Sequence, residues 1–221
     1  MKAITIIFSL IILMSSCAKP SYKKNEILKP QIEEKTETIV DESIVNQKLN
    51  AEQQIASALL AAPMEGRDEA MVYGYGESGE FTILREGSNE FICVADDPGK
   101  DGFQVVSYHK SLEPMMAKGR TLNEEGKSRE EKEAIREDEA KSGKMSLPET
   151  PATLHIYYGK TAYFNTDSGL IENAKYRYVV YIPYATQEST GLSLAPTNGS
   201  SHPWLMFPGK YNAHIMITPE K

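Results

Sequence analysis

The sequence predicts an α+β domain in which a mostly antiparallel sheet is flanked by two or three helices. Strand-like segments rich in Tyr, Val and Ile occur in two groups, at residues 70–109 and 154–218. Two capped helical segments lie between these groups, and a shorter helical segment precedes them. Strands that are segregated from helices along the chain are typical of the α+β class.

A short helix is expected at the start of the domain. Asn50 can cap it, and Pro63 follows its end. Ile55, Leu59 and Leu60 recur at helical spacing, so that they share one face. We expect this apolar face to dock on the domain.

The first group of strands comprises four expected segments, at residues 70–75, 81–84, 90–94 and 103–109. Gly, Ser, Glu and Asn residues at 76–79 and 86–89 form the first two connections. Because strands that are joined by such short turns run antiparallel, the sequence predicts an antiparallel arrangement for the first three.

The helix expected next runs from Ser111 to Lys127. Ser111 can cap it, and Glu113 and Pro114 suit its first turn. Gly119 weakens it, since glycine is a poor helix former.

Residues 128–142 form the clearest helical pattern of the chain. Ser128 and Glu131 have the spacing of a capping box, and Glu137 and Lys141 have the spacing of an ion pair. The segment has few apolar residues, which predicts a solvated helix that is a surface excursion or a mobile insert.

The second group of strands is expected at residues 154–158, 176–182 and 214–218. Side chains of a strand alternate between its two faces. Arg177, Val179 and Tyr181 are therefore expected to share one face of the middle strand.

The N-terminal segment has the composition of an export signal. Lys2 gives a positive start, an apolar run follows from Ile4 to Met14, and Ser15, Ser16 and Cys17 come next. The run is too short for a permanent membrane-spanning helix. A small-residue pair followed by Cys resembles the lipobox of bacterial lipoproteins.

This resemblance implies that Cys17 is joined to diacylglycerol, that the chain is cut before it, and that its new N-terminus is acylated. Ala18, where inner-membrane lipoproteins often carry Asp, implies the outer membrane, and the absence of acidic residues directly after the Cys implies its periplasmic face. The alternatives are an ordinary cleaved signal with an unmodified Cys17, and an uncut anchor.

The expected organisation is a signal peptide at residues 1–16, a lipidated Cys and flexible tether at 17–50, and a single α+β domain at 51–221. The tether is rich in Lys, Glu, Thr and Gln, and Tyr22 is its only aromatic residue. The domain includes a charged helical excursion near residues 120–145.

The charge of the chain argues against nucleic acid as a partner. The formal net charge is −7, and removal of residues 1–16 takes away Lys2 and makes it −8. Nucleic-acid binding requires a basic patch. We expect the membrane, through the lipid anchor, as one partner, and a small ligand or an envelope protein as another.

Two motifs in the first half of the chain resemble ligand sites, but neither pattern is complete. Gly74, Gly76 and Gly79 spell GxGxxG, but a strand rather than a helix follows them, which favours a hairpin turn. Asp97 and Asp101 lack the remaining ligands of a calcium loop, and only a looser oxygen site at Asp96, Asp97 and Asp101 is left open. No cofactor and no metal site are predicted.

Two stretches resemble motifs of an uncharacterised family of exported bacterial proteins. The first comprises residues 84–89 with Phe91, Cys93, Asp96 and Pro98, and the second comprises residues 203–207, Gly209 and 213–217. The resemblance covers about thirty residues and implies membership of a fold family. It implies no activity.

Polar residues in these motifs form the candidate ligand or catalytic cluster: Arg85, Cys93, Asp96, His202 and His214. They would converge at one end of the sheet if the strand at Phe91 paired with the strand at Ile215. Arg, Asp and His side chains that converge can bind a small anionic or polar ligand. The competing interpretation is a buried polar network that fixes the loops. Cys93 itself, between Ile92 and Val94, is expected to be buried.

The sequence therefore supports three hypotheses about function. The first is a lipid-anchored cell-envelope protein that binds a small ligand or an envelope partner. The second is a hydrolase-like envelope enzyme with its site around His214, His202 and Cys93. The third is a structural lipoprotein that forms complexes.

Overall fold

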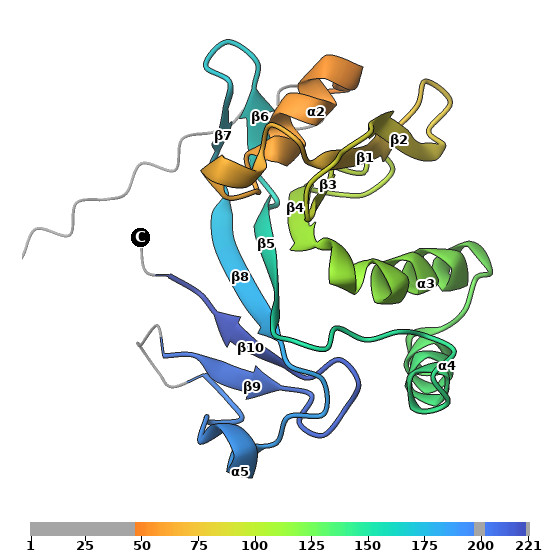
Figure 1. Ribbon diagram of the computed structural model, residues 1–221. Coiled ribbons are helices and arrows are strands. Elements are labelled where there is room, and N and C mark those ends of the chain that lie inside the picture. The colour runs from red at the N-terminus through yellow and green to blue at the C-terminus, as the bar shows by residue number, and fades with distance from the viewer. Residues whose placement is uncertain (1–46, 197–201, 220–221) are drawn as a thin grey trace, which may run out of the picture. The chain divides into compact units, whose positions relative to one another are not determined.

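Within the residues that the computed structural model describes, 47–196 and 202–219, eight strands form one mixed sheet (Figure 1). In order across the sheet they are β2 (Phe81–Arg85), β1 (Met71–Tyr75), β3 (Phe91–Val94), β4 (Phe103–His109), β5 (Ala152–Gly159), β8 (Lys175–Tyr181), β10 (His214–Ile217) and β9 (Trp204–Met206). Only β1 and β3 run parallel, and the other neighbours are antiparallel. The predicted α+β class with a mostly antiparallel sheet is confirmed.

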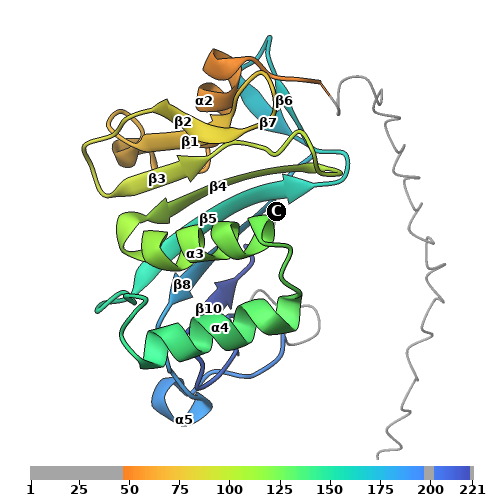
Figure 2. The ribbon, with the colours of Figure 1, turned by 90° about the vertical axis from the view of Figure 1, so that its right-hand side faces the viewer.

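Further elements cover both faces of the sheet. Helix α2 (Ala51–Leu59), the 3-10 turn η1 (Met64–Gly66) and the hairpin of β6 (Tyr163–Asn165) and β7 (Leu170–Glu172) pack on one face. The turn η2 (Lys110–Leu112) leads into α3 (Glu113–Glu124), which lies with α4 (Arg129–Lys141) on the other face, as Figure 2 shows. The one-turn helix α5 (Gln187–Thr190) precedes β9.

Alternation along the strands explains the two cores. In β3, Cys93 packs with Ala58 of α2, whereas Ile92 and Val94 belong to the core beneath α3. Successive side chains of a strand point to opposite faces, so a central strand with apolar residues at consecutive positions supplies both cores.

The pairing expected for the first three strands is wrong in one respect: β3 pairs with β1 and not with β2, and the β1–β3 pair is parallel. The connection after β2 crosses the start of β1, where the amides of Ser88 and Asn89 donate to the carbonyl of Glu69. Gly87 lies against the backbone of Met71, in a space that a Cβ atom would fill. This crossing places β1 between β2 and β3.

The predicted N-caps of α2 and α4 are confirmed, whereas Ser111 does not cap α3, whose N-cap residue is Leu112. Asn50 and Ser128 each form a capping box, at the starts of α2 and α4. The pair of Lys141 and Glu137 is also present, at 2.9 Å. The helix expected from Ser111 begins instead with the 3-10 turn η2, and α3 starts at Glu113.

Helix α4 is solvated, as expected, and none of its residues is buried. It is nevertheless fixed to the rest of the domain by its carboxylates. Glu133 accepts hydrogen bonds from the Tyr211 hydroxyl at 3.2 Å and from the Asn212 amide at 3.1 Å. Glu139 pairs with Lys118 of α3 at 2.7 Å. Polar contacts rather than apolar burial therefore position this helix.

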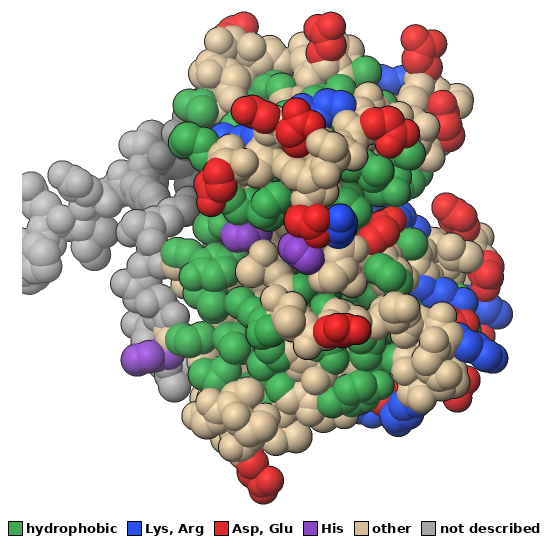
Figure 3. Space-filling view, viewed as in Figure 1, with side chains coloured by type: hydrophobic (Ala, Val, Ile, Leu, Met, Phe, Trp, Pro, Cys, Tyr) green, Lys and Arg blue, Asp and Glu red, His purple; other side chains and the backbone are tan. Residues whose placement is uncertain are grey.

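Acidic side chains stand out over the face of the molecule that Figure 3 shows, in keeping with the negative formal charge. The signal peptide (1–16), Cys17 and the tether up to residue 46 lie outside the described residues. In the part of the chain that is described, every helix is too short or too polar to cross a membrane.

Candidate functional site

The pairing that would gather the five predicted site residues is not formed. Strands β4, β5 and β8 lie between β3, which carries Cys93, and β10, which carries His214. The five residues are therefore spread over the domain, and only Asp96 and His214 line the same groove. The structure does not assemble the predicted cluster.

Arg85 has a structural role at the end of β2. Its guanidinium donates to the carbonyl of Ala70, with distances of 3.0 Å from Nε and 2.7 Å from Nη2, and to the carbonyl of Arg67 at 2.6 Å. These bonds hold the segment that enters β1. The interpretation as a polar network that fixes loops is the one that fits this residue.

Cys93 is fully buried, as expected, and packs among Ala58, Ala62 and Val72 on the face of the sheet that α2 covers. Burial raises the pKa of its thiol above the ordinary value, so the thiolate needed for nucleophilic attack is disfavoured. Neither His202 nor His214 is in this cluster.

His214 lies at the start of β10 with its ring 4.9 Å from the ring of Tyr181 and 5.7 Å from that of Phe207. Its Nδ1 is 2.8 Å from the carbonyl oxygen of Asn212, so Nδ1 carries the proton of the neutral ring. Burial lowers the pKa of His214. His202, by contrast, is an exposed residue before β9 and does not line the groove.

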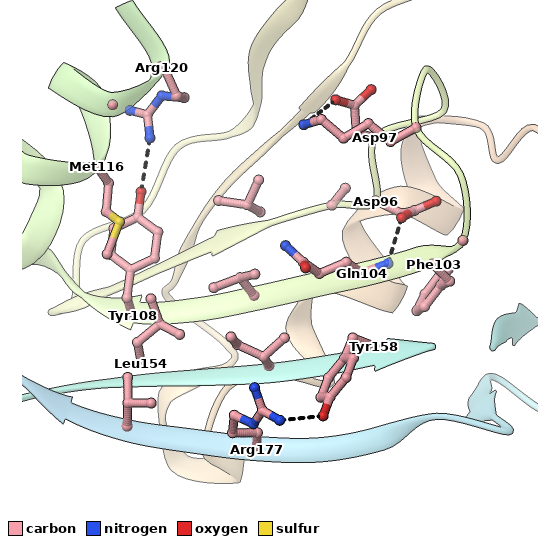
Figure 4. A pocket seen from close by; sticks show the side chains of 18 of the residues that line it. Asp96, Asp97, Phe103, Gln104, Tyr108, Met116, Arg120, Leu154, Tyr158 and Arg177 are labelled. Atoms are coloured by element: carbon pink, nitrogen blue, oxygen red, sulfur yellow. Dashed lines mark hydrogen bonds and ion pairs between the residues drawn. The ribbon is translucent and has the colours of Figure 1, made fainter. Parts of the chain in front are cut away.

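Asp96 follows β3 at the opposite end of the groove from His214. Its Oδ1 accepts the backbone N–H of Gln104 at 2.7 Å (Figure 4). Burial raises its pKa from 3.8 to about 6, an effect that this hydrogen bond only partly offsets. Asp96 also lines a smaller neighbouring cavity of about 190 Å³, together with Lys48 and Gln54.

The groove that contains both residues has a volume of about 670 Å³ and lies on the α3 face of the sheet. Its floor is formed by strands β3, β4, β5, β8 and β10, and residues of α3, of α4 and of the β3–β4 loop border it. A volume of this size is typical of small-molecule sites. The floor is largely apolar and includes Val106, Leu154, Ile156, Val179 and Met216.

Five basic side chains line the groove, and three of them are neutralised by neighbours: Arg120 pairs with Glu113, Arg136 with Glu133, and Lys100 with Asp97. The remaining two are Lys160, which is exposed, and Arg177, which is half-buried. Only these two leave a positive charge available to a ligand.

Arg177 is the functional residue that sequence reasoning did not single out. Its Nη2 donates to the hydroxyl of Tyr158 at 2.8 Å, and its guanidinium lies 5.0 Å from the centre of that ring (Figure 4). Its Nε is buried and has no hydrogen-bond partner, and no carboxylate of the described residues lies within ion-pair distance. A charged residue on the same strand face as Val179 and Tyr181 was the signal in the sequence.

The α3 border of the groove is fixed by a polar network. The hydroxyls of Tyr108 and Tyr73 donate to Glu113, which also pairs with Arg120. The guanidinium of Arg120 lies over the rings of Tyr73 and Phe81 at 5.1 and 5.0 Å. Burial raises the pKa of Tyr108, and its bond to the Glu113 carboxylate adds to this effect. The border is therefore preorganised.

The loop after β3 holds three carboxylates, of Asp96, Asp97 and Asp101. Across residues 47–196 and 202–219, no group of three or more His, Cys, Asp or Glu side chains could hold a metal ion. The looser oxygen site is thus not formed by the described residues.

Comparison with known proteins leaves the site to be interpreted from its own geometry. No protein-family model matches the chain, no curated protein matches it, and no solved structure matches it.

Proposed function

We propose that this chain is a lipid-anchored protein of the bacterial cell envelope that binds a small ligand with an anionic group and an apolar body. The ligand lies in the groove over the sheet, with its anionic group at Arg177. The anchor at Cys17 follows from the export-signal pattern, and the periplasmic face of the outer membrane remains the proposed location.

The ligand proposal rests on the environment of Arg177, which is half-buried and has no carboxylate partner among the described residues. A guanidinium that is half-buried without a carboxylate retains its charge and loses part of its hydration. An anionic group in the groove can pair with this guanidinium in a charge-assisted interaction and offset the lost hydration. The apolar floor beside it supports an aliphatic or aromatic body.

The alternative of an envelope enzyme around His214, His202 and Cys93 gains no support from the geometry. The thiol of Cys93 packs against α2, on the face of the sheet away from the groove that His214 lines. A nucleophile and its base must lie within hydrogen-bond reach of each other. We therefore favour binding over catalysis.

The ligand proposal is tested with two fluorescent probes that differ in one group. The anionic probe is 8-anilinonaphthalene-1-sulfonate, and 1-anilinonaphthalene lacks the sulfonate. In Arg177→Met the dissociation constant of the anionic probe is expected to rise about tenfold, since a charge-assisted bond is lost. The uncharged probe cannot form this bond. Its dissociation constant is therefore expected to change by less than about twofold, which corresponds to a few tenths of a kcal/mol.

The matched control is Arg129→Met, which removes the same charge from an exposed position of α4 outside the groove. It is expected to leave both affinities unchanged. Equal binding of the anionic probe by the wild-type protein and by Arg177→Met, with both proteins folded by circular dichroism, would refute the proposal.

A further inference from the structure

We infer that the ligand of the groove is an elongated zwitterion whose cationic end pairs with Asp96. This inference rests on the proposed function, which places the anionic end at Arg177. It specifies the class of ligand: a molecule with a carboxylate or similar anion at one end, an apolar middle, and an ammonium group at the other end.

Asp96 is the acidic counterpart of Arg177. No basic group of the described residues lies within ion-pair distance of its carboxylate, which accepts the backbone N–H of Gln104. The nearby Lys100 forms an ion pair with Asp97, in which Nζ lies 2.8 Å from Oδ2. A partly buried carboxylate without a cation is costly to the free protein, and a ligand ammonium would relieve that cost.

The pairing register of the sheet sets the distance between Asp96 and Arg177. Val94 of β3 pairs with Val106 of β4, Val106 pairs with Ile156 of β5, and Ile156 pairs with Arg177 of β8. Arg177 thus lies three strands from β3, or about 14 Å at the usual spacing between strands. Asp96 comes two residues after Val94, and adds about 7 Å along the strand direction.

The resulting separation of roughly 16 Å between backbone positions is too long for a direct ion pair of Asp96 with Arg177. Between them lie Val106 and Ile156, in the register row of Arg177, and Gln104 and Tyr158, in the row nearer Asp96, and all four line the groove. Figure 4 shows Asp96 beside Gln104 in the upper part of the view and Arg177 beside Tyr158 in the lower part. Two opposite charges without ion-pair partners, separated by a strip that Val106 and Ile156 make apolar on the Arg177 side, are complementary to an extended zwitterion.

The groups that face Asp96 are consistent with a cationic ligand. Asp97 is its neighbour along the chain and disfavours its ionised form, and Lys100 acts in the opposite direction. Tyr75, from β1, is also close to both carboxylates. Asp101 and Lys160 also line the groove here, with Lys160 beside Gly102, so three acids face two lysines and this end has an excess of one negative charge.

Three probes of matched chain length test the inference by isothermal titration calorimetry at pH 7.5. They are dodecanoate, which carries only the anion, 12-aminododecanoate, which carries both charges, and dodecylamine, which carries only the cation. The wild-type protein is expected to bind 12-aminododecanoate about tenfold more tightly than dodecanoate, the gain typical of one charge-assisted contact.

In Asp96→Asn this tenfold preference is expected to fall to about one, while the affinity for dodecanoate is kept or improved. Asp167→Asn, at an exposed position between β6 and β7 outside the groove, is the control and is expected to retain the preference. Arg177→Met is expected to weaken both dodecanoate and 12-aminododecanoate.

The outcomes separate the two proposals. Binding of dodecanoate that depends on Arg177, without a preference for 12-aminododecanoate, would overturn the zwitterion and leave the proposed function standing. A preference that persists in Asp96→Asn would also overturn it, because another group would hold the ammonium. Failure of dodecanoate to bind at a site that depends on Arg177 would instead contradict the proposed function.

Discussion

Asp96 and Arg177 are single charged residues that have no ion-pair partner among the described residues. Burial raises the pKa of Asp96 to about 6, above the value of 3.8 for an unperturbed Asp. The folded state therefore binds this proton more tightly than the unfolded state does. The contribution of Asp96 to stability is present in full below pH 3.8 and is lost as the pH rises through about 6.

Replacement of Asp96 by Asn should show this dependence. Asn cannot ionise, and its side-chain oxygen can still accept from Gln104. At pH 8 we expect Asp96→Asn to be more stable than the wild-type protein by on the order of 1–2 kcal/mol, which allows for partial solvent screening. The difference should disappear at pH 4 in urea denaturation curves. A difference that is the same at both pH values would rule out this account of Asp96.

Sequence reasoning found one of these two residues and missed the other. Asp96 stood out because it follows a strand and lies in a polar loop. Arg177 did not, because its environment depends on which strands lie beside β8, and pairing between distant segments is not encoded in local alternation. Its position on the same face as Val179 and Tyr181 was predicted correctly, and that face is the floor of the groove.

Helix α4 shows how a polar element can be held in place. Its capping box and its pair of Glu137 with Lys141 follow from local spacing and were predictable. Its contacts with Tyr211 and Asn212 join residues more than seventy positions apart. Local sequence carries no signal for such contacts, and so the helix was expected to be an excursion or a mobile insert.

Glu133 is expected to be the main attachment of α4. Glu133→Gln weakens its bonds with Tyr211, Asn212 and Arg136, and we expect a loss of about 1–2 kcal/mol in the free energy of unfolding. Hydrogen exchange of the α4 amides should also accelerate. The control Glu130→Gln changes an exposed residue of the same helix and should have little effect. Equal effects of the two substitutions would argue against this attachment.

The parallel pairing of β1 with β3 was not predictable from the turns. A short connection normally joins antiparallel neighbours. Here the chain after β2 crosses the entry to β1, where the Ser88 amide bonds to the carbonyl of Glu69 and the Arg85 guanidinium bonds to that of Ala70. Gly87 permits the crossing, and its role becomes evident only when the two segments are seen together.

At the scale of the whole molecule, the charge distribution of the domain and the proposed anchor support the same interpretation of ligand binding. The formal charge is negative, yet the groove retains an unpaired arginine on its floor. Such a site attracts an anionic group locally, while the rest of the surface disfavours anionic polymers. The proposed anchor would hold this groove near a membrane, where amphipathic molecules are concentrated.

The anchor makes a separate prediction about the intact protein. Two or three acyl chains on Cys17 should carry it into the detergent phase of a Triton X-114 extraction, and its mass should include diacylglycerol. Cys17→Ser should abolish both properties, whereas Cys93→Ser is the control for loss of a thiol. Wild-type protein that stays in the aqueous phase with an unmodified mass would refute the anchor.

The groove itself is tested most directly by a crystal structure of the purified full chain with dodecanoate. The account predicts a carboxylate oxygen within about 3 Å of a guanidinium nitrogen of Arg177, the distance of a charge-assisted hydrogen bond, and an aliphatic chain over Val106 and Ile156. Dodecanoate on another surface, with no carboxylate oxygen at the Arg177 guanidinium, would contradict it.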